Sequence, residues 1–443
     1  MKIKLSDHFT YKRLIKFVAP SIFMMVFISI YGVIDGLFIS RCVGKTAFAS
    51  INLIMPFIMV LGGMGFMIGT GGTALVAKVL GEGDKRKANK YFTMLVMFTF
   101  ILGAVLTVLG IIFLRPISYF LGASDEMIGD CVSYGRIVIG FTVTFMLQNL
   151  FQNFLVVAEK PNIGLASTVA AGCTNIVLDA LFVAVFDWGV VGAAFATGIS
   201  QCVGAAIPFV YFLIPNKSLL RLTATGIEIL PIIKSCTNGI SELMSNISAS
   251  IVSMLYNFRL MDMLGEDGVS AYGVLMYVQF IFIAIFIGYV IGVSPVIGYN
   301  YGSSNSDELK NIFKKSIIIV CVVGVILTIM ALSFSGLLAR IFVGYSPELF
   351  ELTKHAFFIF SFSFLIAGIN IFASSLFTSL NNGLISAVIS FSRTLVAQVA
   401  AILILPNIFG TDGIWYSTVV AELLALIVSS AFIVFCAKRY RYM

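Results

Sequence analysis

Twelve apolar segments divide this chain of 443 residues, and each is long enough to cross a lipid bilayer as a helix, which takes roughly 20 residues. They lie near residues 14–39, 51–78, 91–114, 131–157, 162–186, 191–214, 232–258, 271–299, 316–338, 354–379, 384–405 and 414–436. Only 11% of the residues are charged, whereas a soluble domain has about 25%. Strands of a membrane β-barrel would alternate apolar and polar residues, and these segments do not. The sequence therefore predicts an all-α polytopic membrane protein with twelve transmembrane helices.

Lys and Arg residues are distributed unevenly between the two sides of this predicted topology. Only seven of the 28 fall on the side opposite the termini, and Arg393 falls inside a span. Because cytoplasmic loops carry the excess of positive charge, we expect both termini to be cytoplasmic. We expect a multi-pass protein of the cytoplasmic (inner) membrane. The net charge of +7 reflects this topology and contact with anionic membrane lipid, and we expect no nucleic-acid partner.

The two halves of the chain resemble each other when the sequence is shifted by about 221 residues. "FLGASDEM" (120–127) then falls on "FVGYSPEL" (342–349), Gly81 on Gly302 and Thr197 on Thr418. This repeat predicts two pseudo-symmetric six-helix lobes: an N-lobe at 1–215, a cytoplasmic linker at 216–230 and a C-lobe at 231–443. The lobes should be related by a pseudo-twofold axis along the membrane normal. Such duplication suits a transporter with a cavity between its lobes.

Five ionisable residues fall inside the predicted spans. A charge at the bilayer centre costs about 2.5–3.5 kcal/mol on insertion scales, so each of them is a candidate functional residue. They are Asp35, Asp179, Glu242, Arg393 and Glu422.

Asp35 and Asp179 have no basic residue near them in the sequence. Asn175 is four residues from Asp179 and shares its helix face. Burial and mutual repulsion disfavour two charged carboxylates, so a bound proton or a bound Na⁺ would stabilise the pair. Hydrogen bonding between helices is the alternative role for these acids.

The fourth predicted helix carries an amide stripe, because Asn149, Gln152 and Asn153 share one face. This stripe could line a cavity or bond neighbouring helices. Arg393 could reach the membrane surface or pair with a glutamate, and a structural role is favoured for it and for Glu422. For Glu242, a cavity carboxylate that meets cationic substrates and a structural partner are equally compatible with the sequence.

Enzymatic and nucleotide-dependent functions lack their motifs. The glycine-rich stretch "LGGMGFMIGTGG" (61–72) has no GK[ST], and no HExxH pattern is present. His8 and His355 lie outside the span centres. We therefore expect a protein that is not an enzyme and needs no cofactor and no ATPase partner. It should draw energy from an ion gradient, or else transport passively. The internal duplication makes a monomer sufficient.

Several stretches together resemble the multidrug and toxic compound extrusion (MATE) family, most closely its bacterial multidrug exporters. They include "DGLFISRCVG" (35–44), "GTGGTALVAKVLGEGD" (69–84), "NIVLDALFV" (175–183) and "PVIGYNYG" (295–302). The resemblance covers essentially the whole chain and implies a V-shaped pair of lobes. It implies an N-lobe site for the coupling ion, H⁺ or Na⁺, at Asp35, Asn175, Asp179 and Thr197.

Two departures from the family pattern concern the helices that carry its ion sites. Many relatives have proline after the fifth-helix aspartate, where this chain has Ala180, so bending of that helix needs another cause. The polar residue of the tenth helix is Asn370 rather than an acid, and ion coupling should therefore belong to the N-lobe.

The sequence thus predicts a multidrug efflux antiporter that exports lipophilic organic cations and drugs in exchange for H⁺ or Na⁺ by alternating access. The residues expected to line the substrate cavity are Tyr31, Met55, Asn149, Phe151, Gln152, Asn153 and Glu242. A lipid-linked saccharide flippase of the same wider superfamily is the alternative, and a membrane-embedded enzyme is a more remote one.

Overall fold

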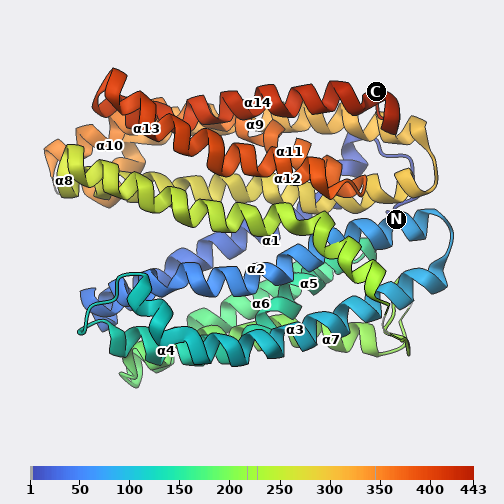
Figure 1. Cartoon of the computed structure of the whole chain (residues 1–443), viewed down its shortest axis with the longest axis horizontal. Coiled ribbons are helices and arrows are strands. Elements are labelled where there is room, and N and C mark those ends of the chain that lie inside the picture. Colours follow the sequence, from blue (N-terminus) through green and yellow to red (C-terminus); the bar gives the residue numbers. More distant parts are fainter. Residues whose placement is uncertain (1–2, 217, 227, 345) are drawn as a thin grey trace.

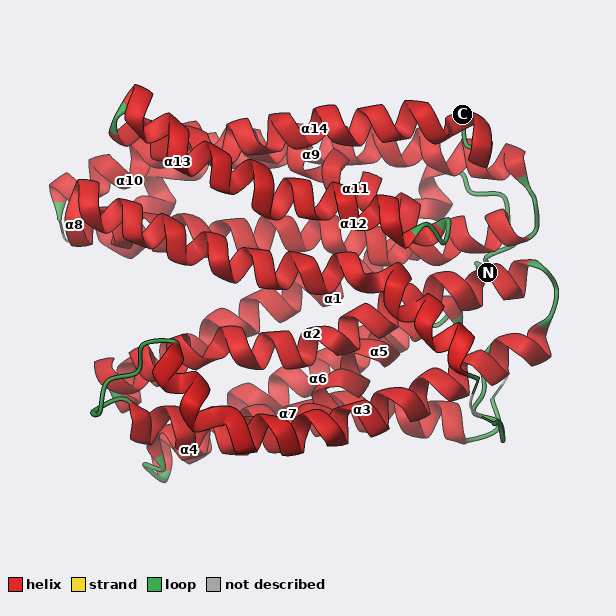
Figure 2. Cartoon of the chain, in the orientation of Figure 1, coloured by secondary structure: helices red, strands yellow, loops and turns green. Residues whose placement is uncertain are grey.

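The computed structural model describes residues 3–216, 218–226, 228–344 and 346–443, so positions 217 and 227 of the predicted linker lie outside it. All regular secondary structure in these ranges is helical (Figure 2). The α-helices are α1 (Tyr11–Phe38), α2 (Lys45–Gly81), α3 (Lys85–Phe120), α4 (Ile128–Gly140), α5 (Thr142–Val157), α6 (Pro161–Asp179), α7 (Gly189–Leu213), α8 (Ile229–Gly302), α9 (Ser306–Val343), α10 (Pro347–Phe360), α11 (Phe364–Ser379), α12 (Gly383–Phe391), α13 (Ala397–Phe409) and α14 (Thr411–Tyr440).

These helices combine into twelve spans within the described ranges. Helices α4 and α5 form one span with a 53° bend, and α10–α11 and α12–α13 are likewise joined through short irregular helical turns. Helix α8 is 74 residues long and contains two spans, because Gly265 interrupts it with φ of 63°. That backbone conformation favours glycine. Each of the twelve predicted segments lies in one of these spans, so the predicted fold class is confirmed.

The spans form two groups (Figure 1). Helices α1–α7 make up one group and α8–α14 the other, and we call these the N-lobe and the C-lobe. The residue limits predicted for the lobes remain a prediction. The lobes meet mainly where α1 and α2 pack against α8. They lie closest at the end that carries both termini and diverge toward the other end (Figure 1).

Glycines make the close contact between the lobes possible. A Cβ atom at Gly71 of α2 would lie 1.9 Å from the carbonyl oxygen of Ser235, so only glycine fits this crossing. Nearer the terminal end, a Cβ at Gly81 would lie 2.0 Å from the Tyr299 carbonyl oxygen, and one at Gly302 would lie 2.0 Å from the Lys78 carbonyl oxygen. Gly81 and Gly302 are equivalent positions of the repeat, as are Lys78 and Tyr299. The pseudo-twofold axis therefore passes between these two glycines.

Candidate ion site and substrate cavity

A cluster of buried polar side chains lies inside the N-lobe, where α1 and α6 end. Asp179 is the last residue of α6, and a π-helical turn, Ala180–Val185, follows it directly. Asp35 lies in the last turn of α1, just before a second π-helical turn, Ile39–Val43. Such turns are rare and often occur at functional sites. The π-helical turn after Asp179 interrupts the regular α-helix at Ala180 without a proline.

The two carboxyl groups of this cluster lie close enough to interact, and Asn175 lies beside them. Asp179 is fully buried and Asn175 is 2% exposed. Neither oxygen of Asp179, nor Oδ1 of Asp35, nor Nδ2 of Asn175 has a hydrogen-bond partner of normal geometry among the described residues. Neither acid belongs to an ion pair of that part of the chain.

Thr197 and Tyr134 complete the cluster. The Oγ1 atom of Thr197 on α7 is buried and unpartnered among the described residues. The hydroxyl of Tyr134 on α4 is also buried without a hydrogen-bond partner among the described residues, and it lies near Thr197 and both acids. Sequence reasoning missed Tyr134, because nothing in the pattern distinguishes it from the other tyrosines of the chain. We call Asp35, Tyr134, Asn175, Asp179 and Thr197 the acid cluster.

The acid cluster can hold a proton or a small hard cation. Its donor set consists of two carboxyl groups, an amide and two hydroxyls, and oxygen ligands of this kind suit hard cations. Buried polar atoms without partners are costly, and a bound proton or cation would satisfy several of these atoms at once. No convergence of three or more His, Cys, Asp or Glu side chains occurs in the described ranges.

A cavity of about 110 Å³ lies between the lobes, and we call it the central cavity. Helix α2 contributes Phe66 and Thr70, and α8 contributes Ile287 and Ile291. These residues form pairs at the 221-residue offset, Phe66 with Ile287 and Thr70 with Ile291. The central cavity therefore lies on the pseudo-twofold axis, which is where transporters built from repeats hold their substrates.

The predicted substrate residues fall into two groups. Asn153 and Glu242 line the central cavity, from opposite lobes. The other five lie outside its lining in this conformation: Tyr31, Met55, Asn149, Phe151 and Gln152.

Within the N-lobe, these five residues pack or hydrogen-bond. Gln152 donates to Thr168 Oγ1 at 3.0 Å, and Asn149 donates to the Gly62 carbonyl oxygen at 3.4 Å. Phe151 is fully buried, with its ring 5.9 Å from that of Phe212. Tyr31 lies near the acid cluster, within electrostatic range of Asp35. Met55 packs against the apolar core around α2 and α4.

Arg393, Glu422 and Asn370 form a polar network in the C-lobe, in which Glu422 and Asn370 are buried and Arg393 is partly buried. Arg393 Nε lies 2.9 and 3.0 Å from the two carboxylate oxygens of Glu422, and Arg393 Nη2 lies 2.8 Å from Oε1. Asn370 donates to Glu422 Oε2 at 2.7 Å. Arg393 is therefore paired with a glutamate and does not reach for the membrane surface, the other alternative that the sequence left open.

Glu242 faces this network across the central cavity. Its carboxylate lies within electrostatic range of Arg393 but forms no ion pair with it within 4.0 Å. Glu422 already neutralises Arg393. Glu242 therefore places a carboxyl group without an ion-pair partner among the described residues in the central cavity, and a ligand cation there would favour its charged form.

Comparisons with known proteins point the same way as this geometry. Residues 20–181 and 243–403 match the MatE family model. The chain is 25% identical to the multidrug export protein MepA of Staphylococcus saprophyticus over 423 residues, 93% of this chain and 91% of that protein. It is 24% identical to MepA of Staphylococcus aureus (strain MRSA252) over 417 residues, again 93% and 91%.

Solved structures share the fold. The outward-facing structure of a multidrug resistance MATE family transporter of the MOP superfamily superposes with a TM-score of 0.92 at 21% identity, covering 98% of each chain. A MATE structure in the bent conformation gives 0.90 at 21% identity, covering 99% of this chain and 97% of the other.

Proposed function

The chain belongs to the MatE family, and we propose that it is a multidrug efflux antiporter that exports lipophilic organic cations and drugs in exchange for H⁺ or Na⁺. The observation that carries this proposal is the pair of carboxyl groups Asp35 and Asp179, which lie together without a basic partner among the described residues, in a lobe that faces a polar cavity on the pseudo-twofold axis. Asp179 is fully buried, and neither of its oxygens nor Oδ1 of Asp35 has a hydrogen-bond partner in that part of the chain. The relatives named multidrug export proteins support it, because they align over 93% of the chain.

The acid cluster supplies the coupling step. When empty, it holds two acids in a low-dielectric interior with no cation nearby, which favours uptake of a proton or Na⁺. Binding replaces repulsion between Asp35 and Asp179 with a shared ligand. Since α1 and α6 carry these acids, occupancy draws the ends of the two helices together and so biases the shape of the N-lobe.

The central cavity supplies the substrate step. Glu242 attracts the cationic centre, and Phe66 and Ile287 provide apolar contact. Its volume of about 110 Å³ holds a substituent rather than a whole drug. The lobes must therefore separate further around a substrate, as alternating access requires.

The contacts between the lobes are arranged for such a movement. They include the close crossings at Gly71, Gly81 and Gly302, and the helices diverge away from the end that carries both termini (Figure 1). With both termini in the cytoplasm, this conformation is closed toward the cytoplasm. The protein would work as a monomer in the cytoplasmic membrane.

The test is transport by the purified chain in liposomes loaded with a fluorescent lipophilic cation. A pH gradient and a Na⁺ gradient are imposed separately on the wild type, Asp35→Asn and the control Asp187→Asn. Asp187 is an exposed acid of the same lobe with φ of 54°, which asparagine tolerates. Transport that is driven by one gradient, lost in Asp35→Asn and kept in Asp187→Asn is expected. Transport under neither gradient would argue against antiport and favour the flippase.

A further inference from the structure

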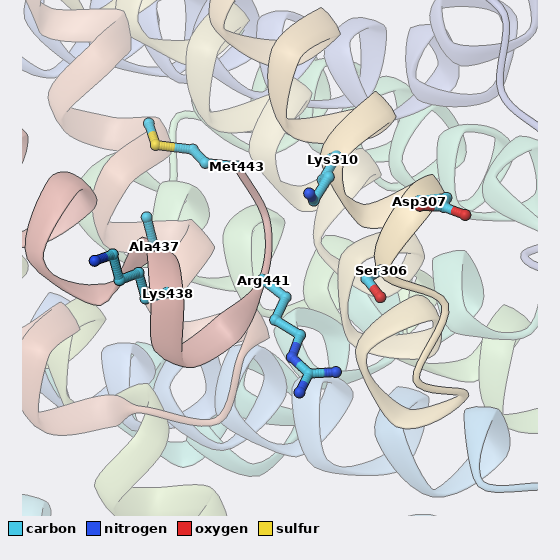
Figure 3. A pocket seen from close by; sticks show the side chains of 7 residues that line it. All are labelled: Ser306, Asp307, Lys310, Ala437, Lys438, Arg441 and Met443. Atoms are coloured by element: carbon cyan, nitrogen blue, oxygen red, sulfur yellow. The ribbon is translucent and has the colours of Figure 1, made fainter.

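A basic pocket of about 270 Å³ lies where α9 begins and α14 ends (Figure 3). It is lined by Ser306, Asp307, Lys310, Ala437, Lys438, Arg441 and Met443. Its lining shares no residue with the acid cluster or the central cavity. The start of α9 and the end of α14 lie at the end of the molecule that carries both termini (Figure 1).

A buried tyrosine fixes the shape of this pocket. The chain reverses after α14 at Arg441, whose φ is 55°, and Tyr442 then returns into the core. Tyr442 is fully buried, its ring lies 5.0 Å from that of Phe313 on α9, and its hydroxyl donates to the Ile433 carbonyl oxygen at 2.7 Å. Arg441 and Met443 flank this anchor and are therefore held beside the start of α9.

The pocket carries more positive charge than its one acid can balance. Lys310, Lys438 and Arg441 line it together with Asp307, and none of the four forms an ion pair within the described residues. The backbone N–H groups of Ser306 and Glu308 at the start of α9 are already hydrogen-bonded, to the Ser304 carbonyl oxygen and to Asn305 Oδ1, so the donors of this pocket are its basic side chains. A phosphate group has the charge and the acceptor oxygens that these donors require.

Apolar stripes lead from the pocket along both helices. On α9, Lys310 is followed at helical spacing by Ile318, Val322, Val325 and Ile329, which are 40–58% exposed.

On α14, Lys438 is preceded at the same spacing by Phe435, Val434 and Ile427, which are 67–85% exposed. A soluble phosphate compound would use only the pocket, whereas a phospholipid would use the pocket and both stripes. We propose that the pocket binds the phosphate headgroup of an anionic phospholipid whose acyl chains lie along α9 and α14.

The N-lobe has no such arrangement at its equivalent end within the described residues. Asn89 stands at the repeat position of Lys310, and its side chain accepts the backbone N–H of Arg221 at 2.8 Å. Thr93 similarly accepts the backbone N–H of Thr223 at 3.0 Å. The segment after α7 thus covers this position, and the N-lobe provides an internal comparison for the test.

The experiment measures lipid retention by the full chain. Protein is purified with equal amounts of phosphatidylglycerol and phosphatidylcholine, and native mass spectrometry counts the lipids that stay bound. The pocket variant is Lys310→Gln/Lys438→Gln/Arg441→Gln. The matched control, Lys85→Gln/Arg86→Gln/Lys87→Gln, removes three exposed charges at the equivalent end of the N-lobe.

One phosphatidylglycerol per wild-type chain is expected, with affinity reduced about tenfold or more in the pocket variant and unchanged in the control. Equal loss in both variants, or no loss in the pocket variant, would refute a specific site. A conservative variant, Arg441→Lys, should keep the lipid, which shows that charge rather than folding is measured.

A competition experiment distinguishes a phospholipid headgroup from a soluble phosphate compound as the ligand of the pocket. Excess glycerol 3-phosphate should leave the lipid bound, because it lacks the acyl chains. Displacement of the lipid by this excess of glycerol 3-phosphate would overturn the lipid assignment in favour of a soluble phosphate ligand. None of these readouts uses transport, so they succeed or fail independently of the proposed drug export.

Discussion

The guanidinium group of Arg393 holds the buried carboxylate of Glu422, with Nε 2.9 and 3.0 Å from its two oxygens. The repeat positions of these two residues in the N-lobe are Gly172 and Gln201, which carry no charge. The C-lobe therefore contains a neutralised ion pair at positions where the N-lobe has uncharged residues. The N-lobe in turn keeps two acids without a counter-ion, so the two lobes differ in charge while sharing a fold.

Replacing Asp179 tests the acid cluster. The substitution Asp179→Asn keeps the shape of the side chain but removes a group that can bind and release a proton or cation. Drug resistance of expressing cells should be abolished while the amount of protein in the membrane stays normal. Full resistance in this variant would contradict the proposed coupling site.

Tyr134→Phe tests a residue that only the structure identified. Its hydroxyl lies unpartnered beside Thr197 and the two acids, so its loss should weaken the ion site without emptying it. We expect the concentration of coupling ion needed for half-maximal transport to rise about tenfold, with little change in the maximal rate. An unchanged ion dependence would remove Tyr134 from the acid cluster.

Glu242→Gln tests the charge of the central cavity. The variant should raise the KM for monovalent organic cations about tenfold, because a charge-assisted contact is lost, while an uncharged substrate of similar size is transported as before. Transport of cation and neutral compound is compared in the same liposomes. Equal effects on both would assign Glu242 a structural role.

Glu422→Gln tests the ion pair of the C-lobe. It leaves Arg393 buried without its counter-charge, which should lower the free energy of unfolding by about 3 kcal/mol. Replacing both partners by methionine should restore most of this loss, since the paired charges are removed together. Thermal unfolding of the purified variants in detergent measures both effects, and equal destabilisation in single and double variants would argue against the pair.

Gly81→Ala tests the contact between the lobes. The added Cβ would lie 2.0 Å from the backbone oxygen of Tyr299, so α2 and α8 must move apart. We expect a lower unfolding temperature and a shift toward the cytoplasm-open form, measured by spin-label distances between the lobes. Gly273→Ala is the control, because a Cβ there meets no atom within 4 Å.

Much of this architecture could be predicted from the sequence, because a bilayer admits few solutions. Twelve long apolar segments have to be helices, and a constant offset between the two halves implies two related bundles. The acid cluster could be proposed for a similar reason, since Asp35 and Asp179 are conspicuous inside apolar segments.

Other parts of the sites depend on packing that a sequence does not reveal. Tyr134 resembles any other tyrosine until α4 places its hydroxyl beside the two acids. Phe151 was predicted to line the substrate cavity, but its ring packs in the N-lobe core. The sequence also does not identify the glutamate that pairs with Arg393. The choice between Glu422 and Glu242 depends on distances between helices that are far apart in the sequence.

The contact between Gly81 and Gly302 has a consequence for how such a chain can evolve. Each half presents the same backbone surface to the other, so the interface between the halves is isologous, as in a twofold-symmetric homodimer. In a true homodimer, every substitution would appear on both sides of the axis at once. Joined in one chain, the halves are released from that constraint. One half can keep its lone acids while the other acquires an arginine, with the shared surface at the axis unchanged.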